Sequence, residues 1–315
     1  MIAPAVTLEI EQSLSERGIL MSGGSSDRCE VLTISQGRYK AEINTFGGGI
    51  KSLSFDNKPL TETYSDSDNP PLSSGVVLAP WPNRTADGAF VYAGQRYQLE
   101  LTEPARNNAI HGLVHNRLWT IAKHSQDGAV LKISLGTGQG WPWPVEIEAE
   151  YLLKDDGLHA HFRAFGTGPF GWGWHTYLSP LGEEVDRAVL TLGVDQELPL
   201  GERNLPVGER TSLSLPLGTG VPIAGHLLDN CYYASNGPVR ATVAVDGRGV
   251  AMECSDNVRW FQVFTPDSAW GMPYPGRDRA IAIEPMTVPP NALNTGINSI
   301  DVHEHFECSV RISAL

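Results

Sequence analysis

A chain of 315 residues with 41% hydrophobic side chains can bury a sizeable core, which excludes a disordered protein and allows one large β domain or two ordinary domains. The formal net charge of −13, without a run rich in lysine and arginine, argues against nucleic acid as a partner, because that binding depends on neutralising many phosphates. The sequence has no recognisable signal peptide and no apolar stretch approaching ~18 residues, so we expect no membrane partner and a cytoplasmic location.

The beginning of the chain predicts an extension followed by strands. Residues 1–27 are polar and carry no sustained pattern, so we assign them to an N-terminal extension and 28–315 to one domain. From Tyr39 onward, Ala41 and Ile43 alternate with polar neighbours, and this period of two is typical of a half-buried strand. The 33 glycines and 22 prolines are spread along the chain, which predicts many short strands joined by turns and few long helices.

Two later stretches predict β-hairpins. Apolar residues alternate through 145–151 and again through 158–164, on either side of an Asp-Asp-Gly turn. The same pattern runs through 239–245 and 250–254 around an Asp-Gly turn. Such strands bury their apolar faces only against one another, so the expected fold class is all-β, a large antiparallel β-sandwich.

The first candidate for chemistry is Arg84, which follows Asn83 just before an apparent hairpin. Prolines on both sides of Trp81 stiffen the preceding segment, which would present the Arg84 guanidinium as a fixed fork of donors to hydroxyl oxygens. The alternative is a solvated surface arginine, and the motif alone does not separate the two interpretations.

A second candidate is His111, which precedes Gly112. A histidine beside a residue without a side chain can approach a ligand closely. His115 follows four residues later, a spacing that would suit a metal pair on a helix. The glycine and the polar run before His111 favour a loop instead.

A third candidate is His175 in the segment Gly-Trp-Gly-Trp-His. If this segment is extended, Trp172 and Trp174 share one face and Gly171, Gly173 and His175 the other. One face would pack in the core while the other leaves room beside the histidine. The alternative is a core histidine whose hydrogen bonds are satisfied.

The fourth candidate is Glu284, which ends an Ile-Ala-Ile run and precedes Pro285. Proline favours an extended residue before it and blocks further ladder pairing, so we expect the carboxylate at a sheet end or edge. A charge beside this apolar run needs a partner, and a structural salt bridge is an equally good interpretation.

In chain order these segments resemble the aldose 1-epimerase (galactose mutarotase) family. The resemblance extends over roughly 28–315, and no single motif decides it. The segments similar to the family's motifs are Asn83-Arg84, Asn108 to Gly112, His175-Thr176-Tyr177, Pro206-Val207-Gly208, Leu228-Asp229-Asn230 and Glu284-Pro285.

The resemblance implies a mutarotase that needs no cofactor and acts on a small-molecule sugar. By this resemblance Glu284 is the base, His175 is the acid, and His111 is a hydrogen-bonding partner near the ring oxygen. Arg84 and Asp229 would bind sugar hydroxyls. Asn83 belongs to the same binding motif as Arg84.

Three positions qualify this interpretation. The N-cap of a short helix is an equally good role for Asp229. Thr176 stands where the family usually has proline, and Leu113 stands where a second glycine is common. These two departures leave the identity of the sugar open. The sequence also leaves open whether the protein forms a homodimer.

Two other functions fit parts of the pattern. A non-catalytic carbohydrate-binding protein would keep the hydroxyl-binding residues but would not need His175 and Glu284 together. A mutarotase for phosphorylated or sulfonated hexoses would need extra cations at the pocket rim. Arginines that would supply them are Arg203, Arg210, Arg277 and Arg279. The acidic chain favours a neutral sugar.

No metal site is predicted. His159/His161 and His303/His305 have strand spacing, but no third ligand is spaced with either pair, and exposed strand faces are the favoured interpretation. The cysteines are far apart without a CxxC pair, so we expect reduced and mostly buried thiols. They are Cys29, Cys231, Cys254 and Cys308.

Overall fold

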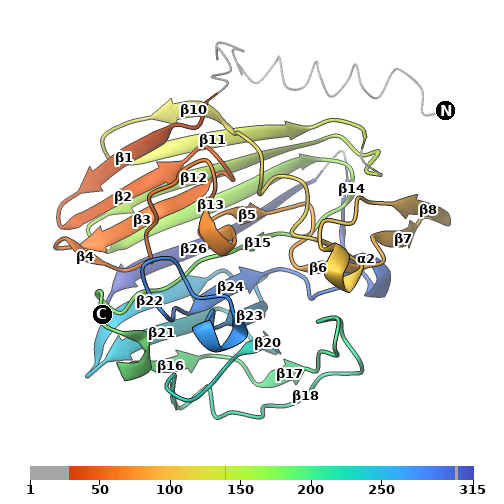
Figure 1. The fold of residues 1–315 in the computed structure, drawn as a ribbon. Helices are drawn as coiled ribbons and strands as arrows, with labels where there is room; N and C mark the ends of the chain where they lie inside the picture. Colours follow the sequence, from red (N-terminus) through yellow and green to blue (C-terminus); the bar gives the residue numbers. More distant parts are fainter. Residues whose placement is uncertain (1–27, 139, 302–303) are drawn as a thin grey trace.

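The computed structural model describes residues 28–138, 140–301 and 304–315, and it is built almost wholly from antiparallel strands (Figure 1). The expected extension at 1–27 lies outside the described residues. A nine-stranded sheet contains, in spatial order, β10 (Thr120–His124), β11 (Gly128–Leu135), β12 (Val145–Lys154), β13 (Gly157–Gly166), β26 (His305–Ala314), β22 (Arg248–Cys254), β21 (Val239–Val245), β16 (Val189–Leu192) and β19 (Val221–Pro222).

A seven-stranded sheet and a four-stranded sheet complete the main framework. The seven-stranded sheet contains β18 (Thr211–Ser212), β17 (Gln196–Leu198), β20 (Asp229–Tyr233), β23 (Trp260–Phe264), β24 (Ala282–Met286), β15 (Gly173–Trp174) and β5 (Val77–Leu78). The four-stranded sheet contains β1 (Val31–Gln36), β2 (Tyr39–Asn44), β3 (Gly49–Phe55) and β4 (Lys58–Pro59).

The remaining described elements are three two-stranded pairs and several short helices. The two-stranded pairs are β6 (Arg84–Ala86) with β9 (Asn108–Ile110), β7 (Ala89–Tyr92) with β8 (Gln95–Gln98), and β14 (Gly168–Pro169) with β25 (Ser299–Ile300). The described helices are η1 (Pro71–Ser73), η2 (Pro104–Arg106), η3 (Val185–Arg187), η4 (Ser268–Trp270) and α2 (Ala292–Thr295). In the described part of the chain, no helix is long and apolar enough to span a bilayer.

Both predicted hairpins are confirmed. Strands β12 and β13 pair from Val145 opposite Gly166 to Lys154 opposite Gly157, and the residues of β12 alternate between buried and partly exposed until the turn. Strands β21 and β22 are joined by Asp246 and Gly247, both with positive φ as a tight hairpin turn requires. The period-two patterns therefore predicted local pairing correctly.

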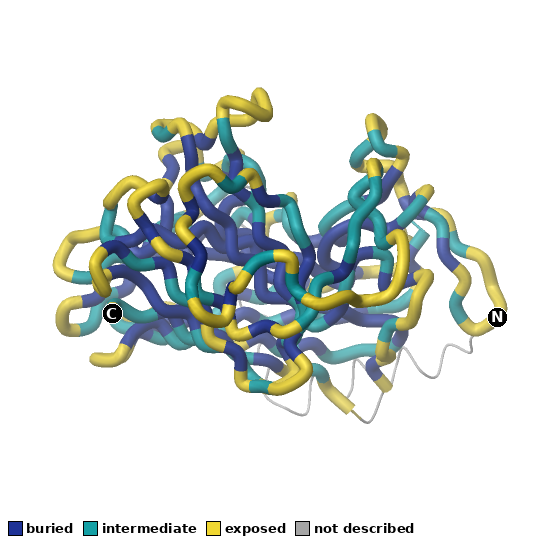
Figure 2. The backbone as a smooth tube through the Cα atoms, turned by 90° about the horizontal axis from the view of Figure 1, so that it is seen from below, coloured by how far each residue is buried: buried dark blue, intermediate teal, exposed yellow. Residues whose placement is uncertain are grey.

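The core lies between the sheets, as expected for a sandwich (Figure 2). Phe162 of the nine-stranded sheet contacts Trp172 and Trp174, with ring centroids 4.5 and 5.3 Å apart. The Tyr151 hydroxyl donates to the carbonyl oxygen of Gly48 over 2.7 Å and so joins the nine-stranded sheet to the four-stranded one. The large antiparallel β-sandwich is thereby confirmed.

The four cysteines are all free, as the sequence predicts. Cys231, Cys254 and Cys308 are buried, and Cys29 is partly exposed. Burial raises the pKa of all four thiols, which keeps them protonated and unreactive at neutral pH.

Candidate active site

Glu284 lies in the middle of a central strand, so the expected position at a sheet end or edge is wrong. On one side β24 pairs with β23, where Glu284 is opposite Gln262. On the other side Gly173 is opposite Met286. Tyr177 is opposite Ala282, so the register continues past β15. His175, midway between Gly173 and Tyr177, is therefore directly opposite Glu284. Side chains at such paired positions share one face of the sheet.

A missing hydrogen bond explains how a proline is tolerated here. The N–H groups of Ile283 and Thr287 donate to the carbonyl oxygens of Thr176 and Trp172. A residue with an N–H at position 285 would reach the carbonyl of Trp174, but proline has none. The Thr176 N–H donates to that carbonyl instead, over 3.0 Å, and the chain makes a tight turn centred on His175.

The glycine face of this segment is packed, which corrects the expectation of open room. A Cβ atom on Gly173 would lie 2.7 Å from the Cβ of Pro82, and one on Gly171 would lie 2.4 Å from a methyl group of Val288. The glycines therefore let Pro82 and Val288 pack against the strand. The space beside His175 is bounded by other side chains.

His175 and Glu284 form a buried pair. The distance from His175 Nε2 to Glu284 Oε1 is 3.4 Å, with side-chain exposures of 7% and 3%. His175 Nδ1 and Glu284 Oε2 are also buried, and neither has a hydrogen-bond partner among the described residues. His175 is therefore not a satisfied core histidine, and the close contact of the Glu284 carboxyl group is with this histidine rather than with a lysine or arginine.

Their surroundings favour the uncharged form of both groups. Burial, followed by the negative charge of Asp229, raises the pKa of Glu284 well above its ordinary value. Burial also lowers the pKa of His175 from 6.5 to about 3.

His111 completes a group of three imidazoles. It follows β9 with a φ of 66°, and Gly112 has a φ of 74°, so the predicted loop is confirmed. The ring centroids of His111 and His175 are 5.3 Å apart, and those of His111 and His115 are 6.0 Å apart. Burial and the neighbouring His175 lower the pKa of His111, which keeps it neutral.

Arg84 is buried, which contradicts the surface alternative, but its fork is not free for a ligand. Its Nε and one terminal nitrogen donate to the two carboxylate oxygens of Glu103 over 2.8 and 3.0 Å. Although burial alone would raise the pKa of Glu103, hydrogen bonds from Arg84 and other donors lower it, so this carboxylate is ionised. The remaining terminal nitrogen lies 3.5 Å from Asn83 Oδ1.

A chain of side-chain hydrogen bonds links Arg84 to Asp229. The Asn83 amide donates to Gln262 Oε1 over 3.3 Å, and the Gln262 amide donates to Asp229 Oδ1 over 2.6 Å. Asp229 begins strand β20, so its alternative role as a helix N-cap is wrong. Asn83, Arg84, Gln262 and Asp229 form a connected polar wall beside Glu284.

The loop between β17 and β18 closes this wall. Asn204 donates to Asp229 Oδ2, and Arg203 donates to the carbonyl oxygens of Arg106 and Asn107 over 2.8 and 2.7 Å. We call residues 199–208 the strap. Sequence reasoning missed Glu103, Gln262 and Asn204, because isolated polar residues in loops and strands carry no spacing signal.

The four arginines considered as anion ligands already have partners. Their partners are Asp87 for Arg203, Glu62 and Glu184 for Arg277, Asp186 and Asp267 for Arg279, and the ring of Tyr233 for Arg210. Three of the four positive charges are thus offset by carboxylates within the described structure.

The remaining sequence features fall outside this site. The described residues contain no group of three or more His, Cys, Asp or Glu that would hold a metal ion. His159 and His161 lie on β13, where His159 contacts Asp156, and His303 is outside the described residues. Thr176, the residue in place of the family's proline, donates its hydroxyl to the carbonyl oxygen of Ile283 and so ties the two central strands together.

Comparison with known proteins identifies the family. The aldose 1-epimerase family model matches residues 30–313. The chain is 29% identical over 277 residues to a protein of Escherichia coli K12 described as uncharacterized protein YihR, and the match covers 85% of this chain and 87% of that one. A GalM/aldose epimerase homologue from C. elegans has a TM-score of 0.80 at 16% identity, covering 91% and 99% of the two chains. A galactose mutarotase-like protein from Clostridium acetobutylicum has a TM-score of 0.78 at 20% identity, covering 91% and 98%. The chain belongs to the aldose 1-epimerase family.

Proposed function

We propose that this protein interconverts the α and β anomers of a neutral aldose, with Glu284 and His175 exchanging protons with the sugar. The observation that carries the proposal is the buried pair, 3.4 Å apart, in which each group keeps one buried heteroatom without a partner among the described residues. Acid/base opening of a pyranose needs one group that takes a proton and one that gives a proton.

In the proposed mechanism the pair holds one proton in the sugar-free protein, on the Glu284 carboxyl group, because burial favours the uncharged form of both groups. When the anomeric hydroxyl donates to Glu284, it favours the ionised carboxylate, and the proton of the pair passes to His175. Glu284 then takes the O1 proton while His175 protonates the ring oxygen O5. The C1–O5 bond breaks with its electron pair moving to O5, and O1 becomes the aldehyde oxygen.

Ring closure is the same sequence in reverse. The aldehyde rotates by half a turn about the C1–C2 bond, O5 attacks the other face of C1, and the two protons return. His111 lies next to His175 and would form a hydrogen bond with the sugar near the ring oxygen. Asn83, Asp229 and the terminal nitrogen of Arg84 that Glu103 does not occupy would hold the sugar hydroxyls on the polar wall.

A neutral substrate suits the charges on this site. Glu103 offsets Arg84, and Asp229 and Glu284 add carboxyl groups to the wall. A phosphate or sulfonate would therefore compete with carboxylates for arginines that are already paired. The choice of a neutral sugar rests on this balance.

The test is NMR anomer exchange on Glu284→Gln and His175→Asn, with glucose, galactose and hexose 6-phosphates as substrates. Glu284→Gln keeps the side-chain shape and removes the base, and His175→Asn keeps a donor but removes the exchangeable proton, so kcat should fall by ~10² or more while the sugar still binds. Asp246→Asn, in the exposed β21–β22 turn, is the matched carboxyl-to-amide control. Wild-type protein that binds glucose without accelerating exchange would instead be a carbohydrate-binding protein.

A further inference from the structure

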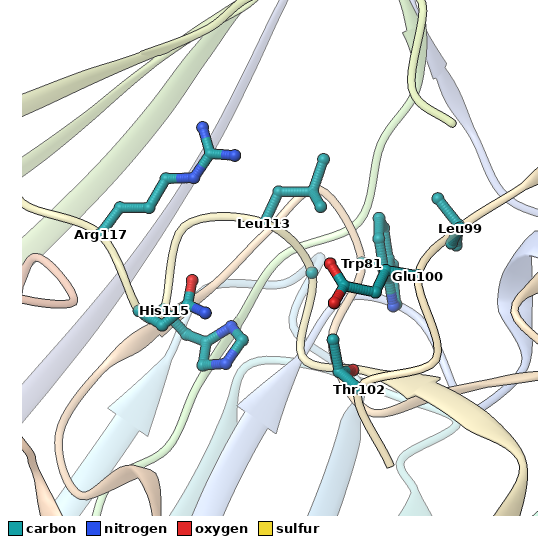
Figure 3. A pocket seen from close by; sticks show the side chains of 9 residues that line it. Trp81, Leu99, Glu100, Thr102, Leu113, His115 and Arg117 are labelled. Atoms are coloured by element: carbon teal, nitrogen blue, oxygen red, sulfur yellow. The ribbon is translucent and has the colours of Figure 1, made fainter. Parts of the chain in front are cut away.

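A pocket of about 200 Å³ opens beside the proposed site, between the segment that follows β8 and the loop that follows β9 (Figure 3). Trp81 and Leu113 give it apolar walls, and Glu100, His115 and Asn116 give it polar ones. Figure 3 shows the Glu100 carboxylate next to the Trp81 indole, with the His115 imidazole on the facing side. The proposed acid/base pair does not line this pocket, so it is a separate feature.

The pocket adjoins the proposed site through His111. Gly112, the next residue, lines the pocket. The His115 ring on the pocket wall is 6.0 Å from the His111 ring, which is 5.3 Å from the His175 ring. The three rings therefore place the pocket next to the proposed site, with His111 between them.

Several polar groups of the pocket have unused hydrogen-bonding capacity. Trp81 Nε1 and His115 Nδ1 are buried without a partner among the described residues. A buried polar atom without a partner costs about 1–3 kcal/mol, so a ligand oxygen at this point would be favoured. Glu100 and Asn116 are exposed members of the pocket lining, so their carboxylate and amide are accessible to a ligand.

This combination selects an uncharged ligand rich in hydroxyl groups. An indole and a leucine side chain suit the C–H faces of a sugar ring, and the carboxylate accepts hydrogen bonds from hydroxyl groups. The lining contains one carboxylate, Glu100, and one guanidinium, Arg117 (Figure 3), so it has no excess charge that would favour an ionic ligand. A volume of about 200 Å³ is below the usual range for drug-sized ligands, and it suits one sugar ring rather than a longer glycan.

Resting on the proposed function, we propose that this pocket is a second sugar subsite. It holds the uncharged non-reducing unit of a disaccharide while the reducing unit reacts at Glu284 and His175. The natural substrate class is then a short reducing oligosaccharide rather than a monosaccharide alone.

The experiment compares anomer exchange of glucose with that of disaccharides whose reducing unit is glucose. Maltose and lactose test 1→4 linkages, and isomaltose and melibiose test 1→6 linkages. We expect at least one disaccharide to have a KM about tenfold below that of glucose. Glu100→Gln, which removes the charged acceptor, and Asn116→Trp, which fills the pocket, should each abolish this preference. Both should leave glucose turnover within about twofold, which also shows that they are folded, and Asp246→Asn should alter neither substrate.

The outcomes separate the two proposals. Wild-type protein that turns over glucose without preferring any disaccharide overturns the subsite and leaves the mutarotase proposal standing. The same conclusion follows if the preference survives both pocket variants. Protein that accelerates no sugar overturns the mutarotase proposal, and the subsite with it.

Discussion

In the proposed mechanism Asp229 acts through its charge as well as through contact with the sugar. Burial is the larger cause of the raised pKa of Glu284, and the negative charge of the Asp229 carboxylate raises it further. In this mechanism the pair works only while it holds one proton, so activity should be lost on the alkaline side as pH rises through the Glu284 pKa. On the acid side it should be lost as pH falls toward about 3, where His175 takes a second proton.

Asp229→Asn should therefore move the alkaline limb to lower pH. The substitution removes a negative charge but keeps an oxygen that can accept from Gln262. With less opposition to ionisation, Glu284 loses its proton earlier. The measurement is kcat by anomer exchange across the pH range, since KM also changes when a sugar-binding residue is altered. An alkaline limb at its wild-type position would show that Asp229 does not control the titration of Glu284.

The depressed pKa of His175 also predicts a stability effect. In the unfolded chain this histidine takes a proton as pH falls through 6.5, whereas in the folded protein it stays neutral down to about 3. At this group the unfolded state then binds more protons, so the contribution of His175 to the free energy of unfolding falls with decreasing pH by up to ~1.4 kcal/mol per unit. His175→Asn should lose this slope and gain stability relative to wild type between pH 6 and 4. Urea unfolding at several pH values measures the difference, and His305→Asn, at an exposed position, should not reproduce it.

At the scale of elements, the site depends on the register between β24 and β15. Alternation within a strand is visible in the sequence, so β12, β13, β21 and β22 were predictable. The pairing of His175 with Glu284 was not, because it joins strands from distant parts of the chain. Pro285 suggested that Glu284 lies at a sheet edge. The tight turn centred on His175, in which the Thr176 N–H donates to the Trp174 carbonyl that Pro285 leaves free, has no sequence signature.

The strap supplies a second element-scale prediction. Arg203 anchors it to the segment before β9, and this anchor holds Asn204 against Asp229. Arg203→Ala should raise KM about tenfold, because about 1–2 kcal/mol of hydrogen bonding is lost, while kcat changes little. Arg210→Ala removes a charge next to the same loop, where Arg210 stacks on Tyr233, and should leave KM near wild type. An unchanged KM in Arg203→Ala would contradict a positioning role for the strap.

At the scale of the whole molecule, composition and hairpin patterns predicted the all-β sandwich correctly. Individual motifs indicated Arg84, His111, His175 and Glu284, and the structure brings them together. The motifs could not predict that other side chains of the protein already form hydrogen bonds with these candidate ligand-binding groups. Glu103 holds the Arg84 fork, a contact between residues 19 positions apart that depends on the paired strands β6 and β9.

The polar wall joins residues that are far apart in the sequence. Asn83 and Gln262, linked by one hydrogen bond, are separated by 179 positions, and Glu284 is further still along the chain. Contacts of such long sequence separation close long loops before they contribute stability, and they slow folding. No contiguous fragment that lacks either end of this span contains the site. Anomer exchange regained after dilution from urea should therefore follow the last cooperative folding step, and catalysis itself becomes a reporter of complete assembly.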